Sequence, residues 1–145
     1  MSDSQAPTDA GEPAPSRLAL DPRAPDPLVR GLPAPVAAFI QATNLGDQEA
    51  LLATFVDDAL VNDQLQDYWG KPAISVWAAR DIIGERLRID VVHTVAHYGH
   101  LIVTAHVDGL FDKRGLPDPL VLAFYFSSHD SKIVQLIILR NLSGI

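Results

Sequence analysis

The chain has 145 residues, a formal net charge of −7 and no cysteine. This composition excludes disulfides, thiolate catalysis and cysteine-ligated metals, and it lacks the basic patches that bind nucleic acids or anionic membranes. No apolar run approaches the roughly 20 residues that span a bilayer, and the N-terminal sequence is polar and acidic rather than signal-like. We therefore expect a cytoplasmic protein with no nucleic-acid or membrane partner.

The chain begins with a proline-rich segment. Eight of the eleven prolines lie within residues 1–35, among Ala, Asp and Ser. This stretch lacks the apolar periodicity that would offset its own ordering entropy. We expect a disordered or loosely packed arm over residues 1–34 and one folded α+β domain over 35–145.

Three helices are predicted in the first half of the domain. Pro35 suits a first helical turn, and Gly46 is suited to end that helix. Asp47 is placed to N-cap a second, short helix. Pro72 opens a third helix that ends near Gly84.

Strands are predicted elsewhere, and they fill the second half of the chain. A short strand is expected around 58–63, and four longer ones, rich in β-branched and aromatic residues, at 88–98, 100–111, 119–128 and 132–141. The separators are too short for parallel crossovers, so these four strands form an antiparallel meander. Helices then cover one face of the sheet. Because the last two strands are apolar on both faces, we expect a second copy of the chain on the other face, which makes a homodimer.

Three consecutive pieces of sequence carry a family resemblance. They are AAFIQATNLGDQEALLATFVDDALVND, GKPAISVWAARD and the strand meander that ends in KIVQLIILRN. Together they resemble the SnoaL-like and ketosteroid-isomerase-like branch of the nuclear transport factor 2-like superfamily, over roughly residues 36–141. The resemblance implies a cone-shaped (cystatin-like) roll in which N-terminal helices pack in a strongly curved, mostly antiparallel sheet around a blind pocket. Its members are commonly dimers, and they include isomerases, dehydratases, epoxide hydrolases and polyketide cyclases, as well as proteins with no assigned activity.

The resemblance also implies site residues. The general base of the isomerases corresponds to Asp63, and their pocket aromatic corresponds to Trp77. Their middle strand, matched to GHLIVTAHVD, implies that Thr104, His106 and Asp108 point inward. Asp63, His106 and Asp108 are then the candidate catalytic residues, and the candidate ligand-binding residues are Trp77, Thr104, Leu122, Phe124, Leu136, Ile138 and Arg140.

Two positions depart from the isomerase pattern. Phe39 and Leu122 stand where the isomerases have the two donors of their oxyanion hole, and neither side chain can donate a hydrogen bond. Because such donors contribute several kcal/mol to transition-state stabilisation, we do not expect steroid isomerisation by that mechanism.

Each candidate residue also has a purely structural interpretation. Asp63 could terminate a strand and cap a turn. His106 and Asp108 could lie on a solvated sheet face, because the alternate residues of their strand (Leu101, Val103, Ala105 and Val107) are apolar enough to form core. Arg140 could be an exposed or interface charge.

The functional hypothesis is a pocket protein for a small, mostly apolar molecule. One version is a cofactor-free lyase, isomerase or hydrolase that uses Asp63 and a His106–Asp108 pair for proton transfer. The alternatives are a non-catalytic ligand-binding protein and a dimeric accessory domain. His93 and His97 have the four-residue spacing of helical zinc ligands but fall in a predicted strand, so neither a metal nor a cofactor is expected.

Overall fold

A computed structural model describes residues 27–140 of the chain. Its elements, in chain order, are α1 (Pro27–Arg30), α2 (Ala34–Leu45), α3 (Gln48–Leu52), β1 (Phe55–Asp63), β2 (Gln66–Trp69), α4 (Gly70–Trp77), the π-helix η3 (Ala78–Ile83), β3 (Arg88–His97), β4 (His100–Asp108), β5 (Leu120–His129) and β6 (Lys132–Arg140). Most of residues 1–34, the predicted arm, lies outside the described range. Within that range, none of the helices is both long and apolar enough to cross a bilayer.

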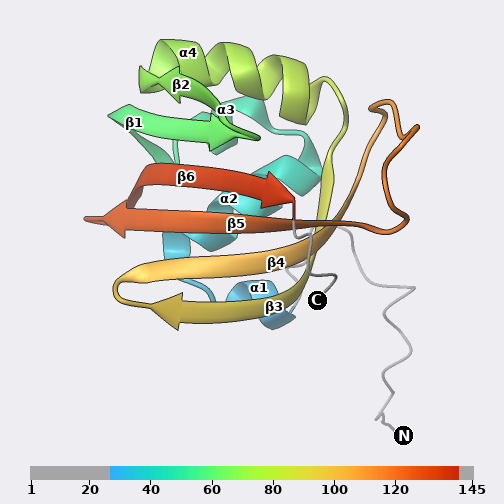
Figure 1. Cartoon of the computed structure of the whole chain (residues 1–145). Helices are drawn as coiled ribbons and strands as arrows, with labels where there is room; N and C mark the ends of the chain where they lie inside the picture. Colours follow the sequence, from blue (N-terminus) through green and yellow to red (C-terminus); the bar gives the residue numbers. More distant parts are fainter. Residues whose placement is uncertain (1–26, 141–145) are drawn as a thin grey trace, which may run out of the picture.

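Gly46 and Asp47 end one helix and begin the next, as the sequence predicts. Helix α2 ends at Gly46, whose φ of 72° is the left-handed conformation that glycine adopts at little cost. The side chain of Asp47 then caps α3 by accepting a hydrogen bond of 3.0 Å from the backbone N–H of Ala50. These two caps place a sharp bend between α2 and α3, so that both helices lie against the same face of the sheet (Figure 1).

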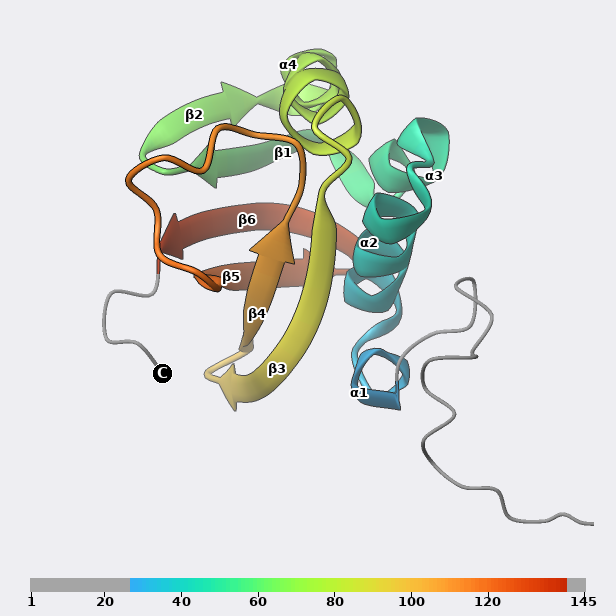
Figure 2. The same ribbon diagram turned by 90° about the vertical axis from the view of Figure 1, so that its right-hand side faces the viewer.

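The six strands form one open, curved sheet in the order β2-β1-β6-β5-β4-β3. All neighbours are antiparallel except β1 and β6, which are parallel. Two-residue turns with positive φ connect the hairpins, for example Tyr98-Gly99 between β3 and β4. The sheet wraps around α2 (Figure 2), and this α+β roll confirms the predicted fold class.

The core fills the concave side of the sheet. Phe39 of α2 is fully buried and makes edge-to-face contacts with Phe55 and Phe126, with ring centroids 5.9 and 5.5 Å away. At the end of α2, the Asn44 side chain accepts a hydrogen bond of 2.7 Å from the N–H of Ile89 and donates one of 3.0 Å to the Ile89 carbonyl. Asn44 thereby ties the central helix to the edge strand β3.

Three features differ from the sequence expectation. Residues 66–69 form strand β2 rather than a loop, since a two-residue turn folds them back onto β1. The third helix changes from α to π at Ala78. Val29, within the expected arm, is 5% exposed and packs in the core, so the described domain begins before residue 35.

Candidate functional site

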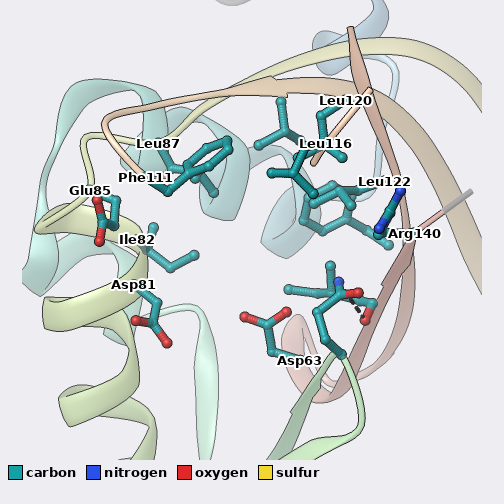
Figure 3. Close-up of a pocket in the computed structure, with 14 residues that line it drawn as sticks. Asp63, Asp81, Ile82, Glu85, Leu87, Phe111, Leu116, Leu120, Leu122 and Arg140 are labelled. Atoms are coloured by element: carbon teal, nitrogen blue, oxygen red, sulfur yellow. Dashed lines mark hydrogen bonds between the residues drawn. The ribbon is translucent and has the colours of Figure 1, made fainter. Parts of the chain in front are cut away.

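A pocket of about 280 Å³ lies where β1, β6 and η3 meet the loop between β4 and β5. Its walls are mostly apolar, and its polar side chains are few. The lining residues are Asp63, Gln64, Asp81, Ile82, Glu85, Leu87, Val107, Phe111, Leu116, Leu120, Leu122, Phe124, Ile138 and Arg140 (Figure 3). A largely apolar cavity with a few convergent polar groups is the usual form of a small-molecule site.

Asp63, the last residue of β1, is held in this pocket by a tryptophan. The indole Nε1 of Trp77 donates a hydrogen bond of 3.0 Å to Asp63 Oδ2. Trp77 is itself fully buried at the end of α4, so the carboxylate has a rigid support. The register also pairs Asp63 with the buried Ile138 of β6, which directs the carboxylate toward the concave side.

The environment of Asp63 raises the pKa of its carboxyl above the ordinary value. Desolvation by burial is the main cause, and the negative charge of Asp81 adds to it. Hydrogen bonds from the side chains of Trp77 and Gln64, together with the charge of Arg80, act in the opposite direction. A carboxylate with a raised pKa is a stronger base than one in water, which suits it to accept a proton.

The π-helix supplies a second carboxylate. Ile82 and Asp81 of η3 both line the pocket, and single-turn π segments occur frequently at functional sites. Asp81 accepts two hydrogen bonds of 2.8 Å from Arg80, which also donates one of 2.9 Å to the Tyr68 hydroxyl. Asp81 therefore forms an ion pair with Arg80 and also lines the pocket.

The charged groups of the pocket are divided between its two sides. In Figure 3, Asp81 and Glu85 lie on the helix side, Arg140 lies on the sheet side, and Asp63 lies between them. Arg140 stands on β6 opposite Leu122 of β5. Among the described residues, no carboxylate forms an ion pair with it.

The loop between β4 and β5 closes one wall of the pocket. Phe111 and Leu116 of this loop line the pocket on one side and a second hollow, of about 500 Å³, on the other. The loop is tied to the end of η3 by a hydrogen bond of 2.7 Å from Leu110 N–H to the Glu85 carbonyl. It runs across the open end of the curved sheet (Figure 2).

The inward orientation expected for His106 and Asp108 is wrong. Both side chains are exposed, they line the second hollow, and Asp108 forms a 2.8 Å ion pair with Lys113. Thr104 lies on the same outer face and does not line the pocket, although it is buried there.

The physical reason is the phase of strand β4. Val103, Ala105 and Val107 face the core, because the register places Val103 beside Phe124 and Ala105 beside Leu122. The apolar set of the alternation is therefore buried, and a shift of one residue exchanges the two faces completely. The match of β4 to the family pattern was out of phase by that one residue.

The other expected residues lie in or next to the pocket. Asp63, Leu122, Phe124, Ile138 and Arg140 line it directly. Trp77 and Leu136 are fully buried and do not line the pocket, but Trp77 donates a hydrogen bond to Asp63, which does.

Sequence reasoning missed the contribution of η3 and of the β4–β5 loop. Asp81 is four residues after Trp77, which indicates the same side of a helix, but this spacing does not distinguish a residue at a pocket from one that forms an ion pair in solvent. Glu85 and Phe111 had no local signal, since one follows a helix end and the other lies in a loop. Among residues 27–140, no group of three or more His, Asp or Glu side chains is placed to hold a metal ion.

The sequence matches no family model and no curated protein. Its structure, in contrast, is similar to many solved ones. A candidate polyketide cyclase from Sinorhizobium meliloti is 27% identical, with a TM-score of 0.68, and the match covers 77% of this chain and 98% of that one.

Two further structures carry the isomerase fold. A ketosteroid isomerase-like protein from Catenulispora acidiphila, in complex with trimethylamine, is 22% identical with a TM-score of 0.62, over 78% of this chain and 89% of that one. A Δ5-3-ketosteroid isomerase from Mycobacterium sp. is 20% identical with a TM-score of 0.61, over 77% and 93%. These neighbours confirm that the chain resembles the SnoaL-like and ketosteroid-isomerase-like branch of the nuclear transport factor 2-like superfamily.

Proposed function

We propose that this protein is a cofactor-free enzyme that transfers a proton within a small, mostly apolar substrate, with Asp63 as the base. One observation carries the proposal: a carboxylate with a raised pKa is fixed by Trp77 in a mostly apolar pocket. Perturbed carboxylates in clefts are characteristic of acid–base sites. Lyases, isomerases and cyclases all use such a step, and the candidate polyketide cyclase among the neighbours supports this range of activities.

The pocket limits the substrate. Its volume of about 280 Å³ lies near the lower end of ligand-pocket volumes, which start at about 300 Å³. Leu122, Phe124 and Ile138 provide an apolar floor for a compact ring system. His106 and Asp108 have no part in this proposal, because both lie outside the pocket.

Steroid isomerisation by the known mechanism is not proposed. Phe39 is fully buried against Phe55 and Phe126 and does not line the pocket, and Leu122 lines it with an apolar side chain. Neither position supplies a hydrogen-bond donor to a developing oxyanion.

A binding protein without turnover is the second candidate. The observation in its favour is the scarcity of donors in the pocket: among the lining residues that the structure describes, only the side chains of Gln64 and Arg140 can donate hydrogen bonds. A protein that only sequesters an apolar ligand needs no such donors.

Proton exchange distinguishes the two candidates. We would incubate the protein in D₂O with 2-tetralone, a compact ketone with acidic C–H bonds, and follow deuterium uptake by NMR. An enzyme accelerates the exchange well beyond an equal concentration of acetate, and Asp63→Asn slows it by about 10²–10⁴-fold because the base is lost. If 2-tetralone binds but exchanges at the acetate rate, the binding function is favoured and Asp63 is not a base.

A homodimer in the cytoplasm is the second part of the proposal. On the outer face of the sheet, Ile102, Tyr125 and Ile137 form one cross-strand row, and all three are half-buried in the single chain. An apolar row at the centre of an uncovered sheet suits a second copy of the chain. Sedimentation velocity should give twice the monomer mass, and Tyr125→Arg should give the monomer. The acidic, cysteine-free composition supports the compartment, and cell fractionation tests it.

A further inference from the structure

We propose that a groove between the end of α2 and the start of β3 is a second binding site, in which Arg86 and Arg88 hold the phosphate group of a small phosphate monoester. The groove has a volume of about 530 Å³. Its walls come from the last turn of α2, with Gly46, and from the segment that joins η3 to β3. The inference goes beyond the proton transfer proposed for Asp63 and does not depend on it.

The charge of the groove favours an anion. Among the described residues that line it, Arg86 and Arg88 are the only charged ones. These two positive charges contrast with the formal net charge of −7 of the whole chain. A concave surface lined by charges of one sign raises the local concentration of ions of the opposite sign. Two positive charges without a carboxylate match a doubly charged anion.

Both guanidinium groups are available to a ligand. Arg86 and Arg88 are exposed, and among residues 27–140 no carboxylate forms an ion pair with either of them. Asp108 stands opposite Arg88 in the register of β3 with β4, but it forms its ion pair with Lys113 instead. Glu85 lines the pocket and not the groove.

The backbone of Arg86 gives an independent reason to assign a role to its side chain. Arg86 has a φ of 51°, in the left-handed region. Its N–H donates to the Ile83 carbonyl at 3.0 Å, and the N–H of Leu87 donates to the Ile82 carbonyl at 2.9 Å. These two bonds form a Schellman motif, whose left-handed position usually holds glycine because a Cβ atom there costs conformational free energy.

The helix end on the opposite side of the groove has the usual residue. Gly46 has a φ of 72° and closes α2 with the same pair of bonds, from its own N–H to the Thr43 carbonyl and from the Asp47 N–H to the Ala42 carbonyl. The same motif therefore holds glycine on one side of the groove and arginine on the other. Residues kept in unfavourable backbone conformations cluster at functional sites, which supports a binding role for the Arg86 side chain.

The walls of the groove define the ligand further. A guanidinium matches the oxygens of a phosphate group with paired N–H donors, and a phosphate monoester carries close to two negative charges at neutral pH. Leu45, which is 45% exposed, and the half-buried Ile83 offer apolar surface to the organic group of the ester. The amide of Asn44 is already bonded to the backbone of Ile89.

Calorimetry with four probes tests the site on the full chain. The probes are phenyl phosphate, inorganic phosphate, phenol and the dicarboxylate phthalate, at about pH 8, where the phosphates are doubly charged. We expect phenyl phosphate to bind most tightly, and Arg86→Gly and Arg88→Gln each to weaken it by about tenfold, the effect of one hydrogen bond to a charged group. Inorganic phosphate or phthalate that binds as tightly as phenyl phosphate would overturn the assignment to a phosphate monoester.

Arg114→Gly is the matched control, because it removes the same charge from an exposed arginine outside the groove. It should leave the affinity for phenyl phosphate unchanged. An affinity in Arg86→Gly equal to that in Arg114→Gly would refute the site.

Thermal unfolding without ligand separates binding from a structural role of Arg86. Glycine adopts the left-handed φ without strain, so Arg86→Gly should not lower the unfolding temperature. An arginine that serves only to complement the negative end of α2 would lower it when replaced and would leave phenyl phosphate binding intact. That pair of results would overturn the inference.

Discussion

Asp63 and Trp77 are 14 residues apart in the sequence and are joined by a hydrogen bond of 3.0 Å between the indole Nε1 and the carboxylate Oδ2. The bond links the end of β1 to the end of α4. It stabilises the ionised form of Asp63, while burial and Asp81 disfavour it. The pKa of the proposed base therefore depends on two opposing effects: the hydrogen bond from Trp77 lowers it, and desolvation by the apolar walls raises it.

Trp77→Phe should raise the pKa of Asp63 further. The variant keeps an aromatic ring but loses the donor that favours the carboxylate, so the acid limb of the pH–rate profile moves to higher pH. The loss of buried volume also lowers stability, by about 1–3 kcal/mol. The profile of exchange rate against pH measures the first effect.

The control for this variant is Phe126→Leu, which also removes buried aromatic volume but lies beside Phe39 in the core. It should lower stability without moving the acid limb. An identical pH profile in wild type and Trp77→Phe would mean that the indole does not tune the base.

Asp63→Asn should increase stability at neutral pH. The pKa of Asp63 is higher in the folded state than in the unfolded state, so the folded protein binds more protons between the two values and stability falls as pH rises through that window. Below the unfolded value of 3.8 both states are protonated and the effect vanishes. Asparagine stays neutral and can still accept the bond from Trp77.

Urea unfolding across the pH range measures this difference. The free energies of unfolding of wild type and Asp63→Asn should diverge as pH increases, with the variant the more stable. A wild type that gains stability relative to the variant with rising pH would contradict the raised pKa.

His106→Ala and Asp108→Asn should leave ligand binding and proton exchange within about twofold of wild type. Both side chains lie on the outer face, outside the pocket. Exposed substitutions of this kind change stability by about 0.5 kcal/mol or less. A large loss of exchange in either variant would require a different conformation of β4 and would restore the family-based assignment.

Phe111→Ala should widen the range of ligands. Phe111 lines both the pocket and the second hollow, so its removal joins the two spaces. Calorimetry with aromatic ketones of increasing length should show weaker binding of one-ring ligands and stronger binding of longer ones. Leu120→Ala is the comparison, since Leu120 also lines both spaces but belongs to β5 and not to the loop. The proposed wall would be refuted if both variants kept the wild-type size preference.

The helix boundaries and the positions of the long strands could be predicted from local sequence. Pro35, Gly46 and Asp47 marked helix boundaries because a fixed φ, a left-handed φ and a capping carboxylate each act within a few residues. The alternation of apolar residues located the long strands for the same reason. The family resemblance added the roll and implied the role of a general base for Asp63.

Local sequence could not predict which face of strand β4 is buried. Period-two alternation shows that two faces exist, and only contact with β5 decides which of them is buried. Matching the motif put His106 and Asp108 inside, while packing of Val103 and Ala105 against Phe124 and Leu122 put them outside. The apolar set prevailed because its burial stabilises the fold and burial of two ionisable groups would cost free energy.

By itself, then, the sequence determined the order and type of the main elements, the caps that end them and the one carboxylate that terminates β1, since these depend on neighbours along the chain. Only the tertiary structure decided which charges share the pocket. Asp81 enters through the π-helix, Phe111 through a loop and Arg140 through the register of β6 with β1 and β5. Those placements depend on contacts between segments far apart in the chain, where a change of one residue in helix winding or strand phase moves a side chain to another face.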